Sequence, residues 1–449
     1  MAESSIADPH PLPYDVGVID AQRAPLAALA PTGRRKGILS YALGNSCAIL
    51  IGLISSYLAL VLGRLASPSL LDLRNVDLVS YYTVGKMILA GHAGSIYTWS
   101  ALARTQAPLG GHAYSVAGAI PFQYPPFFAL FLPALALLPY YAAYLVAFAV
   151  NTLLLTVALF WLEQHASIGR RQGIALRWAT FTCLPVFLAL ANGQSTMYLL
   201  ALLTLSLAAM LSDRPVLAGA ALGMAAIKPF YVLPLLLCFV IRGEWRAITS
   251  SIVSGAALLL LPIPVFGPSI YLSYAGLERQ VSSWQGLPSN GLTTAGIPIS
   301  PATYAPQWNH SLAGFTQLLT SGGTSWFVLY VAGSLVLLAA CVWMARRSST
   351  IDIPFAAAVA TGLLISPHTL AYDLTLLVIP VAIVCRYRSH LPQVGAILGA
   401  VYISVTVGYR LAFLIPFQLS VLGSLALVAA LILALWRRDR AGKIAPVPA

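Results

Sequence analysis

The sequence predicts an all-α, polytopic integral membrane protein, and three observations support this. Hydrophobic residues make up 59% of the 449 residues and charged residues only 8%, whereas a typical soluble domain has roughly 25% charged residues. The apolar residues fall in many separate blocks that approach the length of a membrane-spanning helix. Most Arg and Lys residues lie in short clusters between these blocks, as the positive-inside rule requires. The formal charge of +12 therefore indicates membrane lipids with anionic headgroups as neighbours, and it gives no reason to expect nucleic acid.

Apolar blocks separated by polar breaks define the candidate spans. Both ends of the chain are expected in the cytoplasm, because basic clusters precede the first block and follow the last. The number of true crossings should then be even, and about twelve are predicted. Thirteen candidate blocks are present, at 40–63, 123–139, 141–162, 179–191, 195–211, 216–228, 230–242, 247–266, 326–345, 353–366, 372–387, 393–409 and 411–436.

Two arrangements give an even number of membrane crossings, and the sequence leaves both open. Residues 123–139 form a re-entrant segment in the first, which places Arg170, Arg171, Arg177 and Arg214 inside. Residues 216–242 form one kinked helix in the second, which places those arginines outside. The positive-inside rule favours the first arrangement.

Outside these spans the chain divides into tails and loops. Residues 1–36 are expected to be a disordered cytoplasmic tail, residues 37–436 a single transmembrane domain, and residues 437–449 a second cytoplasmic tail. Residues 64–122 and 267–325 are expected to be extracytoplasmic loops. Within the first loop, residues 78–89 alternate at helical spacing and predict an amphipathic helix on the membrane surface.

The side chains that could bind a metal ion or form a disulfide are not arranged for either purpose. All five cysteines fall within apolar blocks and are typical of small buried side chains. No closely spaced set of His, Asp and Glu is present. We therefore expect no metal site and no cofactor.

Asp77 is one of only 13 acidic residues, and it follows the first apolar block. One interpretation is a solvated loop charge or an ion pair with Arg74. The other is a general base that faces a lipid-borne substrate. Residue type alone does not choose between them.

Polar residues and helix breakers recur at the ends of apolar blocks. Under the favoured topology they all lie on the same side of the membrane as Asp77, where ionisable groups usually line a cavity. Broken helices also expose backbone groups that only a cavity or packed protein can satisfy. The clusters are Phe122–Pro126, Asn192–Ser195, Lys228–Phe230, Asn309–Leu312, Ser366–His368 and Tyr372–Asp373.

Each of these signals has a structural interpretation when taken alone. Lys228 either extends its amine towards the membrane interface or binds an anion. His310 and His368 are typical of loop or cap residues, and Asp373 of a helix cap or a partner of Arg410.

Taken together, the order of these motifs resembles glycosyltransferase family 87. The resemblance runs from about residue 40 to 390, and it is carried by the order and spacing of short motifs. It implies the GT-C fold of multi-spanning glycosyltransferases. The motifs that carry it are Asp77 with Tyr81 and Tyr82, Ile96-Tyr97, Tyr124-Pro125-Pro126, Gly193-Gln194, Arg214 with Gly219 and Gly223, Lys228-Pro229, Asn309-His310-Ser311-Leu312 and Ser366-Pro367.

The resemblance also implies a reaction and its site. Such enzymes move a sugar from a polyprenyl phosphate to a lipid or glycan acceptor at the outer face of the membrane, here that of the bacterial inner membrane. Mannose is the family's best-known sugar, and an Asp or Glu in the first extracytoplasmic loop is the base, a role that falls on Asp77. We expect Lys228, His310 and His368 to bind the donor phosphate. Contacts to the sugar or acceptor are expected from Tyr81, Tyr124, Gln194, Asn309, Tyr372 and Asp373.

Two rival functions remain at this point. A transporter or flippase of a lipid-linked glycan would also be polytopic, but internal repeats are expected in such a protein and none is evident. A polymerase or ligase with diphosphate-linked donors favours an Arg-rich outer loop, whereas residues 267–325 contain Arg279 alone.

Overall fold

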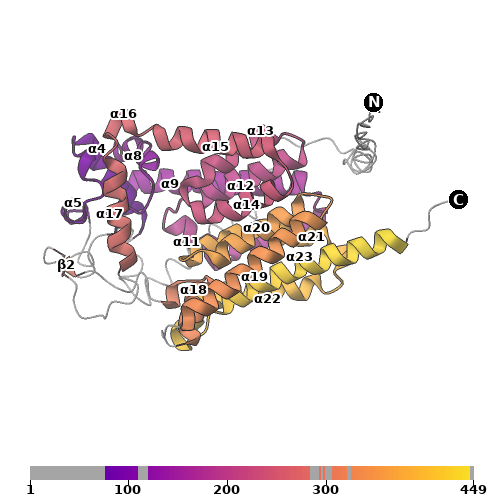
Figure 1. The fold of residues 1–449 in the computed structure, drawn as a ribbon. Helices are drawn as coiled ribbons and strands as arrows, with labels where there is room; N and C mark the ends of the chain where they lie inside the picture. Colours follow the sequence, from indigo (N-terminus) through magenta and orange to yellow (C-terminus); the bar gives the residue numbers. More distant parts are fainter. Residues whose placement is uncertain are drawn as a thin grey trace, which may run out of the picture. The chain divides into compact units, whose positions relative to one another are not determined.

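The computed structural model describes residues 76–109, 120–283, 293–294, 297–298, 306–320 and 325–444. These residues are almost entirely helical (Figure 1), and their only strands are the antiparallel pair β1 (Thr293–Thr294) and β2 (Ile297–Pro298). The predicted tail 1–36, the first apolar block 40–63 and Arg74 lie outside the described residues.

Many of the helices coincide with or overlap the predicted blocks. In the first half of the chain they are α4 (Leu78–Leu89), η3 (Ala93–Ser95), α5 (Trp99–Gln106), α7 (Pro126–Ala129), α8 (Leu132–Ala136), α9 (Tyr140–His165), α10 (Arg170–Thr182), α11 (Leu184–Ala191), α12 (Thr196–Leu211), α13 (Pro215–Met224) and η4 (Ala225–Ile227). In the second half they are α14 (Pro229–Ile241), α15 (Trp245–Leu260), α16 (Ile263–Phe266), α17 (Ile270–Ser283), η6 (Pro306–Trp308), α18 (Leu312–Leu319), α19 (Ser325–Arg347), α20 (Asp352–Ile365), η7 (Ala371–Leu377), α21 (Val378–Arg386), η8 (Arg388–His390), α22 (Val394–Leu414) and α23 (Leu419–Ile444).

Five stretches of the described chain are long and apolar enough to cross a membrane. They are Tyr140–His165, Trp245–Phe266, Ser325–Arg347, Val394–Leu414 and Leu419–Arg440. A sixth is added if α10 and α11, which meet at 54°, form one bent span. Other apolar helices are shorter, and together these helices show a multi-pass membrane protein.

The segment 123–139 does not form one long helix. It is divided into α7 and α8, and each of these begins with a proline in its first turn. The short apolar stretch Pro126–Ala136 is therefore broken, as a re-entrant segment requires.

Residues 216–242 do not form a single kinked helix either. The Oγ of Ser250 donates to the carbonyl oxygen of Val216 at 2.7 Å, and the Oγ of Ser254 donates to that of Ala220 at 3.2 Å. Since contacts advance in the same direction along both helices, α13 and α15 run parallel. The chain must therefore return between them through α14, and it reverses at Lys228.

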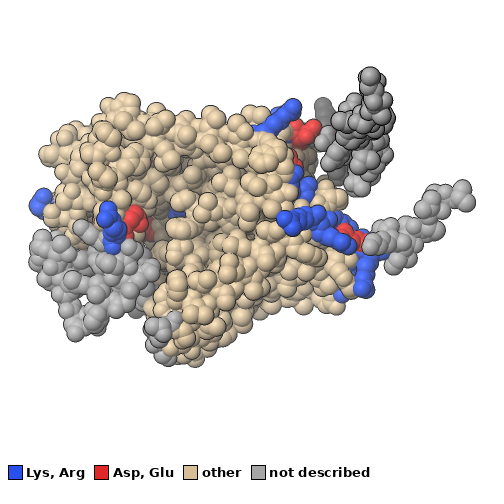
Figure 2. All heavy atoms as spheres, in the orientation of Figure 1, with Lys and Arg blue, Asp and Glu red and all other residues tan. Residues whose placement is uncertain are grey.

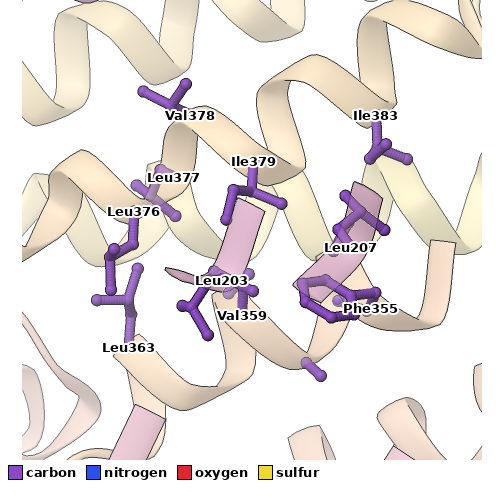
Figure 3. Packing of buried hydrophobic residues seen from close by; sticks show 14 of the residues in the cluster. Leu203, Leu207, Phe355, Val359, Leu363, Leu376, Leu377, Val378, Ile379 and Ile383 are labelled. Carbon is purple, nitrogen blue, oxygen red and sulfur yellow. The ribbon is translucent and has the colours of Figure 1, made fainter. Parts of the chain in front are cut away.

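The core is organised around α20, which is buried along nearly its whole length. Figure 3 shows its Phe355, Val359 and Leu363 packed against Leu203 and Leu207 of α12. The opposite side of this cluster comes from η7 and α21, through Leu376, Leu377, Val378, Ile379 and Ile383. A helix of 14 residues is about 21 Å long, so α20 connects two regions that lie far apart.

The helix predicted for residues 78–89 is present with those bounds, as α4. It does not keep a free face, because only Lys86, Ile88 and Leu89 fall outside its buried set. The helix packs against α5 and α8. It is therefore an integral part of the fold and is covered by protein along most of its surface.

Helix α17 lies within residues 267–325, which were expected to be an extracytoplasmic loop. Its residues Ile270 and Leu277 are 2% and 1% exposed and pack with Tyr97 and Phe122.

Charged side chains gather at the ends of the helices. On the face seen in Figure 2, Lys and Arg cluster around the ends of α13, α21 and α23, while the broad surface between the two ends is almost free of charge. This uncharged band fits the apolar interior of a bilayer.

Candidate active site

Five of the six predicted polar clusters contribute residues to one cavity of about 470 Å³. Eight of the ten predicted site residues line it, namely Asp77, Tyr81, Tyr124, Gln194, Lys228, His368, Tyr372 and Asp373. The two others, Asn309 and His310, are buried beside it and are not among its lining residues.

Asp77 is placed by the turn between α11 and α12. The backbone N–H of Leu78 donates to the carbonyl oxygen of Asn192 at 3.1 Å. Gly193 has a φ of +65°, and a Cβ at this position would lie 3.0 Å from the Cβ of Leu78. Glycine therefore meets both the backbone conformation and the close approach that the turn requires.

This turn places the side chain of Gln194 beside Asp77. The Gln194 amide nitrogen donates to Oδ2 of Asp77, and its amide oxygen accepts from the hydroxyl of Tyr124 at 3.1 Å. Tyr81 donates to the hydroxyl oxygen of Tyr124 at 2.7 Å. A chain of hydrogen bonds thus fixes the carboxylate from one side.

Lys228 and Asp373 form a second polar group on the cavity wall. The lysine Nζ lies 2.5 Å from Oδ1 of Asp373 and 5.2 Å from the ring centre of Tyr372. Asp373 is buried and also accepts from Thr196 at 2.8 Å and from Tyr231 at 3.0 Å. The predicted partner Arg410 is not its ion-pair partner, because Lys228 takes that position.

Asp373 also has the cap role that the sequence suggested. Its Oδ2 accepts from the backbone N–H of Leu370 at 3.2 Å, at the start of η7. The same carboxylate therefore fixes the backbone of η7 and the position of the Lys228 amine.

Asn309 holds two of the sequence motifs together. Its amide nitrogen donates to the carbonyl oxygen of Pro367 at 2.8 Å, and its Oδ1 accepts from the backbone N–H of Thr369 at 3.1 Å. The same oxygen accepts from the hydroxyl of Ser311 at 2.8 Å. Asn309 thus positions the Ser366–His368 segment, which lines the cavity.

Burial keeps both histidines neutral at physiological pH. It lowers the pKa of His310 to about 4 and that of His368 to about 4. His310 lies 2.7 Å from the hydroxyl of Ser420 and stacks on Tyr409. Any contact of these rings with a phosphate is therefore made by a neutral N–H and not by a positive charge.

The cavity gives Asp77 and Lys228 unusual proton affinities. Burial raises the pKa of the Asp77 carboxyl to about 6, although the charge of Lys228 and the hydrogen bond from Gln194 partly oppose the rise. Burial on its own lowers the pKa of the Lys228 amine, but the nearby Asp373 carboxylate outweighs this and the pKa rises above its ordinary value. At neutral pH the cavity therefore holds an ionised carboxylate close to a charged amine.

Several further residues of the cavity were not predicted. Tyr274, Glu278 and Arg279 come from α17 and also line it. The signal was available, because Glu278 and Arg279 are among the few charged residues of 267–325. No group of three or more His, Cys, Asp or Glu side chains is placed to bind a metal ion within the described residues.

The fold and the cavity define the class of protein first. The apolar helices belong to a multi-pass membrane protein, and a cavity with a half-buried carboxylate of raised pKa is typical of an enzyme that handles protons. The chain belongs to glycosyltransferase family 87, whose model matches residues 122–367. It is therefore a membrane-embedded glycosyltransferase, which speaks against the transporter and flippase alternative.

The matched region stops short of some site residues. It contains Tyr124, Gln194 and Lys228, whereas Asp77 precedes it and Asp373 follows it. Tertiary contacts bring these outlying residues to the matched ones. No curated protein and no solved structure matches the chain.

Proposed function

We propose that the protein transfers a sugar, mannose or another hexose, from a polyprenyl phosphate to a hydroxyl of a lipid or glycan acceptor, with inversion at the anomeric carbon. The reaction takes place at the extracytoplasmic face of the bacterial inner membrane. The observation that carries the proposal is the placement of Asp77, which is fixed by Gln194 in a cavity that also contains the Lys228–Asp373 pair.

The reaction forms one bond and breaks one. The acceptor oxygen attacks the anomeric carbon as the bond from that carbon to the phosphate oxygen breaks. The acceptor proton passes to Asp77, and the electron pair of the broken bond leaves with the polyprenyl phosphate. A phosphate leaves without a proton, so a single carboxylate serves here where glycoside hydrolases generally use two.

Asp77 is suited to act as the base. A general base works best when its pKa lies near the working pH, and burial raises that of Asp77 to about 6. The carboxylate is then mostly ionised at neutral pH and still has a useful affinity for a proton. Gln194 and Tyr372 both donate hydrogen bonds to this carboxylate, and an ionised carboxylate has further lone pairs that can accept the acceptor hydroxyl.

Lys228 is suited to stabilise the leaving phosphate. Its amine lies at the cavity wall, is charged at neutral pH and is held in place by Asp373. A positive charge placed where negative charge develops lowers the barrier of such a transfer. Neither step requires a metal ion, and the polyprenyl tail stays in the bilayer.

The proposal is tested by assaying transfer from a panel of polyprenyl-phosphate sugars with the purified protein in nanodiscs. Asp77→Asn should lower the transfer rate by about 10² to 10⁴, the usual contribution of a general base. The fold should persist, because the Asn oxygen still accepts from Gln194.

Asp213→Asn is the matched control. Asp213 is exposed and has a φ of 55°, a conformation that Asn tolerates well, so transfer should stay at the level of the unaltered protein. Turnover by Asp77→Asn within a few-fold of that level would exclude Asp77 as the base.

A further inference from the structure

Helix α17 presents one of its faces to the catalytic cavity. Ile270, Tyr274 and Glu278 follow one another at intervals of four residues, which places them on the same face of the helix. Ile270 is buried and anchors this face, while Tyr274 and Glu278 line the cavity.

An aromatic contact ties this face to the rest of the site. The rings of Tyr97 and Tyr274 lie 5.3 Å apart, and the hydroxyl of Tyr97 donates to the carbonyl oxygen of Tyr124 at 2.7 Å. Tyr274 therefore packs against a residue that contacts Tyr124, a member of the hydrogen-bond network around Asp77.

Glu278 has an unusual environment for a carboxylate. Its Oε1 is buried and has no hydrogen-bond partner among the described residues, and burial raises the pKa of its carboxyl. A buried polar atom without a partner is costly. Such an atom in a native structure calls for an explanation, and a site completed by its ligand supplies one.

We propose that Glu278 and Tyr274 form the acceptor subsite and bind the hydroxyl groups of a carbohydrate-bearing acceptor. The proposal rests on the transfer reaction described above. An ionised carboxylate only accepts hydrogen bonds, so it suits a ligand rich in hydroxyl donors. The ring of Tyr274 supplies an apolar surface beside it.

The Glu278 carboxylate disfavours the donor phosphate at this subsite, although the neighbouring Arg279 also lines the cavity. A carboxylate repels a phosphate, whereas the amine of Lys228 attracts one. The acceptor is the substrate whose hydroxyl reaches Asp77, and its other hydroxyls then extend towards α17. Glu278 therefore selects acceptors that carry several hydroxyls over simple lipid alcohols.

The test compares acceptor and donor kinetics in nanodiscs, with octyl mannoside, octyl glucoside, octyl galactoside and 1-octanol as acceptor probes. Glu278→Leu should raise the KM for the best octyl glycoside about tenfold or more, because a charge-assisted hydrogen bond is lost. Glu278→Gln, which still accepts a hydrogen bond, should raise it less. The KM for the donor should change less than twofold in both variants.

Glu244→Gln is the matched control, because Glu244 lies in the turn before α15 and should leave both values unchanged. A rise in donor KM with constant acceptor KM would overturn the proposal. Unchanged kinetics in Glu278→Leu, or 1-octanol accepted as well as the glycosides, would also overturn it.

A measurement of glycoside binding tests the acceptor subsite independently of the proposed transfer reaction. Saturation-transfer NMR with the same glycosides on Asp77→Asn needs no turnover, and it should show binding that Glu278→Leu weakens. Binding without transfer in the unaltered protein would contradict the proposed reaction and support the subsite. The absence of binding by every glycoside would refute the subsite.

Discussion

Two buried ion pairs occupy opposite ends of α20, and they differ in what surrounds them. At the start of the helix, Asp352 lies 3.3 Å from Arg386 and accepts from the hydroxyl of Tyr387 at 2.8 Å. Just beyond its other end, Asp373 pairs with Lys228 on the wall of the catalytic cavity.

The difference shows how one kind of interaction serves two purposes. Asp352 has no exposed surface, and its partners are protein groups, so its pair holds α20 to α21. The lysine of the second pair remains accessible from the cavity, and a substrate phosphate can share it with Asp373. A buried pair is weak evidence for stability by itself, and the cavity is what indicates function.

Removing the cation of each pair gives the largest expected contrast. Lys228→Met should weaken donor binding about 10- to 100-fold, since a charge-assisted contact to phosphate is lost. Arg386→Met should instead lower the free energy of unfolding by about 3 to 5 kcal/mol, because it leaves Asp352 buried without its cation.

Donor KM and thermal unfolding of both variants measure this contrast. The folded fraction of Arg386→Met should bind the donor within twofold of the unaltered protein. The comparison would fail if Arg386→Met shifted donor KM as much as Lys228→Met, or if Lys228→Met left donor KM unchanged.

The second prediction concerns the pH dependence of the transfer rate, and it applies only to the catalytic cavity. The pKa of Asp77 is raised from 3.8 to about 6, and only the ionised carboxylate can accept the proton. Transfer should therefore be about half of its plateau near pH 6, level off about one pH unit higher, and fall about tenfold for each pH unit well below 6.

A profile of kcat/KM between pH 4.5 and 8 measures this decrease at acidic pH. The residual transfer by Asp77→Asn should not show the decrease. The sign for stability is opposite to that of an ordinary ion-paired Asp. Because the pKa is higher in the folded state, ionisation of Asp77 reduces stability as pH rises from 3.8 to 6. A decrease centred near pH 4 would contradict the raised pKa.

The smallest effect is expected at the turn that positions Gln194. Gly193→Ala puts a Cβ against Leu78 and an alanine at a φ of +65°, which costs about 1 to 2 kcal/mol. Transfer should fall several-fold because Gln194 and Asp77 move apart. Gly94→Ala is the control, since a Cβ there meets no atom within 4 Å; equal effects of both variants would show that the turn is unimportant.

Much of the fold followed from local pattern in the sequence. The helices α12, α14, α19 and α20 begin and end within two residues of the predicted blocks, because long apolar runs bounded by polar breaks identify helices without any tertiary information. The interruption at Lys228 was likewise visible from its proline neighbour.

The features that the sequence did not predict depend on long-range packing. Helix α17 was missed because its sequence has the Gly, Ser and aromatic content of a loop, and its stability comes from Ile270 and Leu277 packing against Tyr97 and Phe122. The burial of α4 has the same cause. Amphipathic spacing gives a helix, but it does not say whether lipid or protein covers its apolar face.

By itself, the sequence determined the membrane class, the order of the polar motifs and Asp77 as the candidate base. Only the tertiary structure decided which motifs meet: Gln194 with Asp77, Lys228 with Asp373, and Asn309 with the segment around Pro367 rather than with the cavity. It also decided that Glu278 faces the site. The physical reason is that hydrogen bonds in the site join residues as far as 177 positions apart. Desolvation, which raises the pKa of Asp77, exists only once those residues have packed together.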